Sequence, residues 1–292
     1  METIHWKKKD RPDSLKTVTR EGVTYLAFPA LEETGLVAHG FSTRLGGVSE
    51  GAFSTMNFSF TRGDDPERVR ENYRRMAKAL GVETESMTLT YQTHTVNVRR
   101  VTAADRGKGV VRERDYRDVD GLITDEPGIT LVTFFADCVP LYFLDPVRRA
   151  IGLSHSGWRG TVARMGRVTA ERMREEFGSQ PEDLIACVGP SICQDCYEVG
   201  EEVAEAFRKE FDPRWHGDIL APGRQAGKYQ LDLWRANEII LLEAGLRPEH
   251  LHVTNICTCC NPELLYSHRR MGERRGNLCA FLGLRDGMGE RL

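Results

Sequence analysis

Three side chains that commonly bind metal ions stand in polar, turn-rich settings of this sequence. They are His94 in YQTHTVNV, Cys138 in FFADCVPLYF and His155 in LSHSGWRG. Each falls at the end of a predicted strand, where a rigid scaffold presents ligands and catalytic groups. Two imidazoles and one thiolate suit zinc, and three protein ligands leave a fourth position for water or substrate. Spacing alone favours a core cysteine and ordinary loop histidines, because no short motif links the three residues.

A second segment combines hydroxyl groups, an arginine and paired glycines, and runs from Ser42 through Arg44 to Gly46 and Gly47. Backbone N–H groups of glycines can approach an anion closely, and an arginine can contact phosphate through two nitrogens. The segment is therefore a candidate anion cradle, but it lacks the Walker pattern, and these residues alone slightly favour a plain Gly-Gly turn. Further candidates are Asn57 and Gln92 for substrate contacts and His39 and Asp137 for proton transfer.

Two cysteine pairs have the C-x-x-C form that zinc sites often use. Cys193 and Cys196 make one pair, and Cys257 and Cys260 make the other, with Cys259 beside it. A zinc ribbon draws its pairs from nearby sequence, whereas about 60 residues separate these two, so the spacing disfavours a shared structural ion.

The elements that must position these residues alternate between short apolar runs and turn-forming Asp, Pro and Gly. Asp65-Pro66 begins a helix that ends at Gly81, since Asp is a good N-cap, Pro suits the first turn and Gly the C-terminus. Other helices are expected over residues 161–177, 201–211 and 231–244. Strands are expected over residues 23–31, 87–91, 96–101, 121–124, 129–134, 139–144, 150–154, 184–188, 252–255 and 277–284. Several strands follow one another as hairpins do, which predicts a mixed α/β or α+β domain over residues 23–292, after an N-terminal extension over 1–22.

Composition and charge limit the classes of partner. The chain has 292 residues, 40% hydrophobic and 28% charged, with a net charge of −3, which is ordinary for a folded domain and gives no support to nucleic-acid binding. The N-terminus lacks the apolar stretch of a signal peptide, and the longest apolar runs are too short to span a bilayer. We expect a cytoplasmic protein that binds small molecules, with reduced cysteines.

Together the motifs closely resemble the laccase-domain, or polyphenol oxidase, family, whose members are also described as purine nucleoside phosphorylases. The motifs occur in family order over roughly residues 37 to 284. They are His39-Gly-Phe-Ser-Thr-Arg44, Gln92-Thr-His94, Asp118-Val-Asp120-Gly, Ala136-Asp-Cys138-Val-Pro140, His155-Ser-Gly-Trp-Arg-Gly160, Gly189-Pro-Ser-Ile192, Cys196-Tyr-Glu-Val199 and Ser267-His-Arg-Arg270.

The resemblance implies one zinc ion on His94, Cys138 and His155. It also implies phosphorolysis of adenosine, inosine, guanosine and methylthioadenosine, with deamination of adenosine. The implied fold is a sandwich of central mixed sheets flanked by helices, similar to the catalytic domain of cytotoxic-necrotising-factor toxins. Those toxins are cysteine deamidases, so a metal-independent hydrolase using Cys138 and His155 is the main alternative.

The number of histidines in this chain is too small for a multi-copper oxidase. A multi-copper laccase needs about ten histidines, mostly in His-x-His pairs, to hold its coppers, whereas this chain has eight histidines and one such pair, His250-Leu-His252. A single copper in place of zinc, with weak polyphenol oxidase activity, stays open because Cu²⁺ competes strongly for nitrogen and sulfur ligands.

Overall fold

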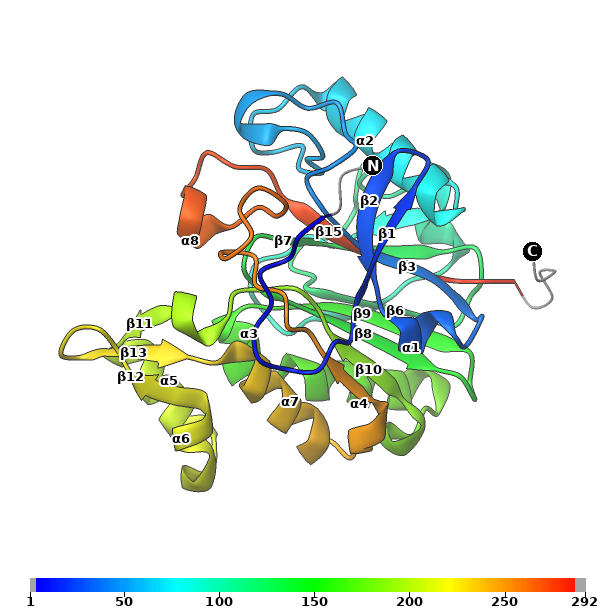
Figure 1. Ribbon diagram of the computed structural model, residues 1–292. Coiled ribbons are helices and arrows are strands. Elements are labelled where there is room, and N and C mark those ends of the chain that lie inside the picture. Colours follow the sequence, from blue (N-terminus) through cyan, green and yellow to red (C-terminus); the bar gives the residue numbers. More distant parts are fainter. Residues whose placement is uncertain (1–3, 287–292) are drawn as a thin grey trace.

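The computed structural model describes residues 4–286 and contains two six-stranded sheets stacked face to face (Figure 1). The first sheet has the order β1-β2-β3-β15-β7-β4, and the second has the order β14-β10-β8-β9-β6-β5. The first sheet contains β1 (Lys16–Arg20), β2 (Val23–Ala27), β3 (Val37–Ser42), β4 (Met87–Leu89), β7 (Thr130–Phe135) and β15 (Leu278–Leu284). The second contains β5 (Val98–Arg100), β6 (Gly121–Thr124), β8 (Val139–Asp145), β9 (Ala150–Ser156), β10 (Ile185–Val188) and β14 (Leu251–Val253).

Helices cover the outer faces of both sheets (Figure 1). Helix α2 (Pro66–Leu80) packs on the first sheet, and α4 (Met165–Phe177) and α7 (Leu233–Glu243) pack on the second. A small third sheet projects to one side with α5 and α6. It has the order β11-β13-β12. The remaining bounds are α1 (Pro29–Glu32), α3 (Trp158–Val162), α5 (Glu201–Glu210), α6 (His216–Ile219), α8 (His268–Met271), β11 (Glu198–Gly200), β12 (Leu220–Pro222) and β13 (Lys228–Leu231).

Three apolar layers hold this arrangement together. The central layer joins the inner faces of the two sheets, with Phe41 and Leu131 from one sheet packing with Tyr142 and Leu153 from the other. The outer layers bury Met76 of α2 and Met173 of α4 against their sheets. Strands such as Leu278–Leu284 are buried at every residue, as expected for strands covered on both faces.

Two chain crossings between the sheets create the place where the candidate ligands meet. The chain leaves the first sheet at the end of β4 and enters the second at β5, and it crosses in the same sense from β7 to β8. Strand β4 lies parallel to β7, while β5 and β8 lie in the other sheet. The two crossing loops, residues 90–97 and 136–138, therefore leave the same end of neighbouring strands.

The predicted mixed α/β class is confirmed, and so is the helix opened by Asp65, whose side chain accepts a hydrogen bond from Glu67 N. The predicted continuous helix over 161–177 is wrong. Arg164 adopts a left-handed φ of 61° between α3 and α4, and its guanidinium pairs with Glu210 and Glu243. The strand expected over 23–31 ends at Ala27, where α1 soon follows. Within residues 16–20, inside the segment expected to be an extension, β1 pairs with β2.

No helix within residues 4–286 combines the length and apolar character needed to cross a bilayer.

Candidate active site

The two crossing loops and one strand bring His94, Cys138 and His155 together. His94 lies in the loop between β4 and β5, Cys138 directly precedes β8, and His155 lies near the end of β9. Strand β8 pairs with β9 so that Pro140 lies opposite His155. Cys138 comes two residues before Pro140 in the chain and is therefore close to His155. One nitrogen of each imidazole and Cys138 Sγ lie within 4.8 Å of one another. Residues separated by about 40 and 17 positions thus form one compact N, N, S group of the kind that zinc accepts.

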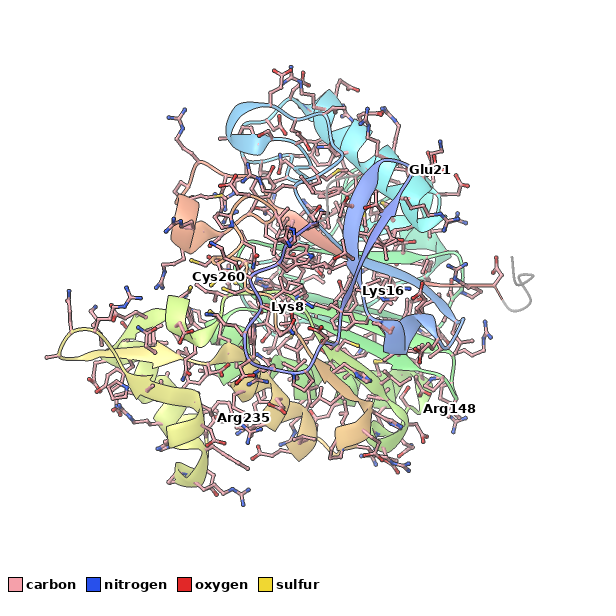
Figure 2. The ribbon with its side chains drawn as sticks, viewed as in Figure 1. Lys8, Lys16, Glu21, Arg148, Arg235 and Cys260 are labelled. Carbon is pink, nitrogen blue, oxygen red and sulfur yellow. The ribbon has the colours of Figure 1, made fainter. Side chains whose placement is uncertain are left out.

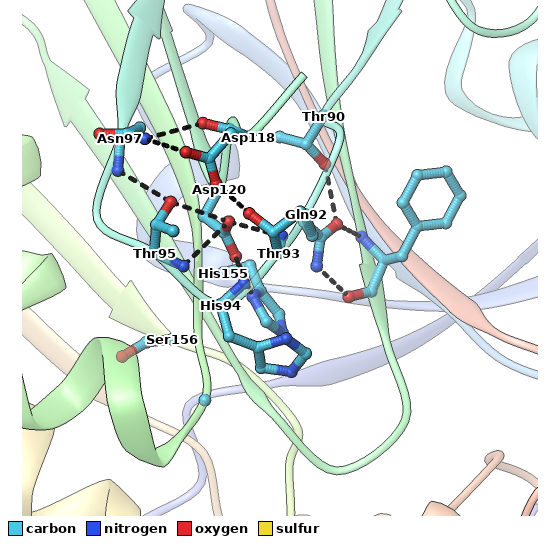
Figure 3. Close-up of polar contacts among 12 residues, drawn as sticks. Thr90, Gln92, Thr93, His94, Thr95, Asn97, Asp118, Asp120, His155 and Ser156 are labelled. Carbon is cyan, nitrogen blue, oxygen red and sulfur yellow. Dashed lines mark hydrogen bonds and ion pairs between the residues drawn. The ribbon is translucent and has the colours of Figure 1, made fainter.

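The buried carboxylate of Asp120 holds His155 and the loop of His94 in place (Figure 3). Asp120 Oδ1 accepts a hydrogen bond from His155 Nδ1 at 2.8 Å, and the backbone N–H groups of Thr93, His94 and Thr95 also donate to its two oxygens. These bonds direct His155 Nε2 towards the group and fix the loop that carries His94. A carboxylate that holds the second nitrogen of a histidine in this way is the usual outer partner of a metal ligand.

Space for an ion or substrate atom is preserved by Gly157. A Cβ atom at this position would lie 3.1 Å from both Cys138 Sγ and His94 Cδ2. The φ of Gly157 is −73°, which any residue can adopt, so the missing side chain matters here for space. The donor set, the Asp120 bond and this clearance together fit a metal ion bound by three protein side chains.

Electrostatics favour the thiolate form of Cys138. Burial by itself would raise its pKa, but the rings of His155 and His94 outweigh burial and lower it to about 6. Burial would likewise lower the pKa of His155, and the Cys138 thiolate and Asp120 carboxylate raise it to about 9. The proton therefore resides on the imidazole and the sulfur is negative near neutral pH. A thiolate is the form that binds metal, and an ion would take the place of that proton as the positive partner.

A cavity of about 480 Å³ opens beside the three candidate ligands, within the ~300–1,000 Å³ range of small-molecule sites. Aromatic side chains and cations line it, together with polar groups from the crossing loop. Its lining includes Ser59, Phe60, Arg62, Thr90, Tyr91, Gln92, His94, Arg114, Phe134, Cys138, His155, Arg275 and Asn277. His94 is exposed while His155 is buried, so the group is open on the cavity side only.

Arg275 is a buried cation without an acidic partner. Only 6% of it is exposed, its Nε has no hydrogen-bond partner, and no carboxylate within residues 4–286 forms an ion pair with it. Burial and the nearby charge of Arg62 lower its pKa to about 10, so it stays charged at neutral pH. Its Nη1 donates to Gly276 O and Asn277 Oδ1. A buried charge without a counter-charge is still costly, and an anion in the cavity would reduce that cost.

The segment predicted as an anion cradle serves another purpose. The guanidinium of Arg44 donates to the backbone carbonyls of Ser54 and Pro262 and lies over the ring of Tyr266. A Cβ at Gly46 would lie 2.4 Å from Gly22 O, and one at Gly47 would lie 2.1 Å from Thr55 O. These glycines allow backbone segments to pack closely, and neither they nor Arg44 line the cavity.

The remaining predicted residues divide between the cavity and its supports. Gln92 lines the cavity, with its amide bonded to both backbone groups of Phe134. Asn57 does not line the cavity, but its Oδ1 accepts a hydrogen bond from the backbone N–H of Asn277, which does. The Ser42 hydroxyl accepts from Cys279 N, inside the first sheet.

The two residues predicted to transfer protons are both engaged elsewhere. His39 is buried in β3 and its Nε2 accepts from Phe28 N, while burial lowers its pKa to about 4, so it is neutral. Asp137 precedes Cys138 with a left-handed φ of 96°. One of its oxygens accepts from Thr258 Oγ1 and the other from Arg269 N, each at 2.6 Å. It therefore anchors the Cys138 loop, and neither residue lines the cavity.

Sequence reasoning did not assign roles to Asp120 or to the three cavity arginines, Arg62, Arg114 and Arg275. The spacing Asp118-Val-Asp120-Gly just before a buried strand is a signal that could have identified Asp120, since an acidic residue there faces the ends of neighbouring strands. Arg275 lies in the polar stretch GERRGN, which gives no sign of its burial.

Comparison with known proteins gives consistent matches. Residues 38–285 match the family described as "Multi-copper polyphenol oxidoreductase laccase". The chain is 37% identical over 254 residues to purine nucleoside phosphorylase YlmD of Bacillus subtilis, covering 86% of this chain and 89% of that protein. It is 35% identical to adenosine deaminase RL5 from an unknown prokaryotic organism, covering 84% and 92%. The crystal structure of YlmD from Geobacillus stearothermophilus superimposes with a TM-score of 0.84 at 34% identity, covering 94% of this chain and 100% of that one.

Proposed function

This chain belongs to the multi-copper polyphenol oxidoreductase laccase family, and from that premise we propose that it is a zinc-dependent purine nucleoside phosphorylase that also deaminates adenosine. The proposed substrates are adenosine, inosine, guanosine and methylthioadenosine, with inorganic phosphate as the second substrate. The observation that carries the proposal is that one cavity contains both a three-ligand metal group and a buried arginine without an acidic partner.

Arg275 gives the phosphate a place in the cavity. Phosphorolysis needs phosphate to attack C1′ of the ribose, which breaks the bond to N9 and yields the free purine and ribose 1-phosphate. Arg62 and Arg114 line the same cavity. Arg62 pairs at 2.7 Å with Glu273, which is largely exposed, and Arg114 lies over the ring of Tyr91. Arginines bind phosphate through two parallel N–H contacts, so Arg275 is the clamp that we propose, with Arg62 as the outer cation.

Aromatic side chains offer a surface for the purine. Phe60, Tyr91 and Phe134 line the cavity and are only partly buried. A flat aromatic base gains contact area and stacking energy on such rings. The side-chain amide of Gln92 donates to the carbonyl of Phe134 and accepts from its N–H. Because Gln92 and His94 lie in the same loop, these bonds fix the aromatic surface relative to His94. Gln92 therefore has a positioning role in our proposal.

The residues of the metal group fit zinc. Zinc held by two imidazoles and a thiolate would lower the pKa of a bound water or polarise a substrate atom, which serves deamination at C6 of adenine. His155 keeps its Nδ1 proton directed at Asp120, and Gly157 leaves the approach to Cys138 Sγ clear. Copper remains a chemically acceptable substitute in this N and S set.

Two alternatives follow from the same residues. A metal-independent cysteine hydrolase also uses a cysteine thiolate beside a histidine imidazolium, as Cys138 and His155 are arranged here. Such an enzyme does not require a second histidine close to the sulfur, whereas His94 lies there. The multi-copper chemistry in the family description requires several ion sites. Within residues 4–286 only two groups have a composition and spacing suited to an ion, and the second contains cysteines alone.

Incubating the enzyme with adenosine, with and without phosphate, tests the proposal. We expect ribose 1-phosphate only when phosphate is present, in an amount equal to adenine plus the hypoxanthine released from inosine, and we expect inosine as the deamination product without phosphate, as resolved by chromatography. A chelator should abolish both reactions, and added zinc should restore them. If adenosine stays unchanged with phosphate and zinc present, or if turnover survives complete metal removal, the proposal fails.

A further inference from the structure

Four thiols lie close together in the loops that follow β10 and β14, outside the candidate active site. Cys193 and Cys196 follow β10, and Cys257 and Cys260 follow β14. These two strands are parallel neighbours, and the pairing continues in a bridge between Ser191 and Cys257. Because parallel strands deliver their following loops to the same sheet edge, two C-x-x-C pairs that are far apart in sequence become adjacent. All four sulfur atoms lie within 4.8 Å of one another.

The spacing of the sulfur atoms matches a single tetrahedral ion. A zinc ion with Zn–S bonds of about 2.3 Å holds its four sulfurs roughly 3.8 Å apart. Cys196 Sγ lies 3.5 Å from Cys260 Sγ, and Cys193 Sγ lies 4.0 Å from it. All four cysteines are unpaired, so no disulfide accounts for their proximity. An iron–sulfur cluster would have to keep several iron atoms between its thiolates, which this compact group does not allow.

Neighbouring groups compensate negative charge on the sulfurs. The backbone N–H of Cys193 donates to Cys257 Sγ at 3.2 Å. The Lys9 ammonium lies beside the same loop, where its Nζ pairs with Asp195 Oδ2 at 2.8 Å. The N-terminal segment crosses this region, since Lys9 N donates to Asn255 O and Lys7 N to Asn261 Oδ1. Figure 2 shows Cys260 beside this segment, near Lys8.

We propose that Cys193, Cys196, Cys257 and Cys260 bind one structural zinc ion as a tetrathiolate, in addition to the ion in the active site. Closed sets of four cysteines are typical of structural zinc, because no position is left for water or substrate. The four ligands come from two loops, so the ion would join the end of β10 to the end of β14 and make those loops rigid.

The proposed ion has a direct connection to the active site. Thr258 lies between two of the ligands, and its hydroxyl donates to Asp137 Oδ1 at 2.6 Å. Ile192, just before Cys193, donates its N–H to Asp137 O at 3.0 Å. The loops after β10 and β14 therefore each form a hydrogen bond with Asp137, the residue before Cys138. In this arrangement the tetrathiolate ion fixes the loop that presents the Cys138 thiolate.

The test uses the full chain and two metal measurements. The unaltered protein should contain two zinc ions per chain by mass spectrometry. The double variant H94A/C138A, which keeps all four thiols, should retain one. Zinc X-ray absorption of that variant should show four sulfur neighbours at about 2.3 Å. Adding C196A and C260A to it should reduce the zinc content to near zero.

Cys259 provides a matched control, because it stands between two proposed ligands but is outside the group of four. The variant Cys259→Ser in the H94A/C138A background should keep its zinc with four sulfur neighbours. If the variant that also carries C196A and C260A does not fold, the absorption measurement on H94A/C138A decides, since it needs no change at the four thiols. Absence of zinc from H94A/C138A, nitrogen or oxygen neighbours in its spectrum, or loss of the ion in the Cys259 variant would overturn the proposal. No outcome depends on catalytic activity, so it stands apart from the proposed function.

Discussion

Replacing Cys138 with alanine should remove one metal ion per chain and lower both phosphorolysis and adenosine deamination by on the order of 10³-fold or more. The sulfur would be the only anionic ligand in the proposed His94, Cys138 and His155 site. Two neutral imidazoles alone bind zinc much more weakly. A loss of 10³-fold corresponds to about 4 kcal/mol of transition-state stabilisation, which is consistent with the several kcal/mol that a catalytic metal supplies. Metal analysis and both assays on the same preparation measure the effect.

Cys187→Ala is the matched control for this variant. Cys187 is a fully buried thiol in β10 that belongs to neither metal group, so its loss should cost some stability and leave both ions and both activities in place. If the Cys138 variant keeps its full metal content and still loses activity, Cys138 acts as a nucleophile and the hydrolase alternative is favoured. If it keeps both metal and activity, the assignment of the site is wrong.

Replacing Arg275 with methionine should lower kcat/KM for phosphate by on the order of 10²-fold and change adenosine deamination by only a few fold. Phosphorolysis uses the anion that Arg275 is proposed to bind, whereas deamination uses water. The same change should alter the unfolding temperature little, because removing a buried charge that has no acidic partner opposes the loss of the Arg275 Nη1 hydrogen bonds to Gly276 O and Asn277 Oδ1. Steady-state kinetics with varied phosphate and a thermal unfolding curve measure the two effects.

Arg44→Met separates this proposal from the role first predicted for Arg44. That guanidinium is held by the carbonyls of Ser54 and Pro262 and by the ring of Tyr266, so its removal should lower the unfolding temperature while the KM for phosphate of the folded protein stays the same. Equal losses of both activities in the Arg275 variant would mean that Arg275 positions the nucleoside. A selective phosphate defect in the Arg44 variant would contradict our placement of the phosphate.

The proximity of His94, Cys138 and His155 could be predicted because each of them stands where a strand ends. His94 and Cys138 lie in loops that leave neighbouring strands of one sheet, and His155 lies on the strand beside Cys138. The chemistry of the three side chains and their positions at strand ends are both visible in the sequence. Their convergence depends on two chain crossings between sheets, which periodicity alone does not show.

The phosphate contact that we propose for Arg275 could not be predicted, because an arginine's role depends on which partners the fold gives it. Arg44 stands beside paired glycines and resembles an anion cradle, yet backbone carbonyls satisfy it. Arg275 stands among exposed-looking polar residues, yet the fold buries it without a carboxylate. Burial and the absence of an acidic partner are properties of tertiary packing, and no local pattern reports them.

Sequence distance was misleading for the two cysteine pairs. Cys196 and Cys260 are 64 residues apart, and the segment between them contains the third sheet together with α5, α6 and α7. After this segment the chain forms β14, which pairs with β10, so the loops that follow the two strands lie side by side. The prediction against a shared ion rested on the usual spacing of zinc ribbons, whereas here parallel pairing of two strands supplies the proximity.

We propose that His94, Cys138 and His155 hold a zinc ion at the wall of the cavity. Anomalous diffraction from crystals of the full chain, recorded just above and just below the zinc absorption edge, tests it most directly. We predict a peak present only above the edge, within about 2.0–2.3 Å of Cys138 Sγ and of one nitrogen of each histidine. Crystals grown from zinc-replete, catalytically active protein that show no such peak among these three side chains would contradict the account.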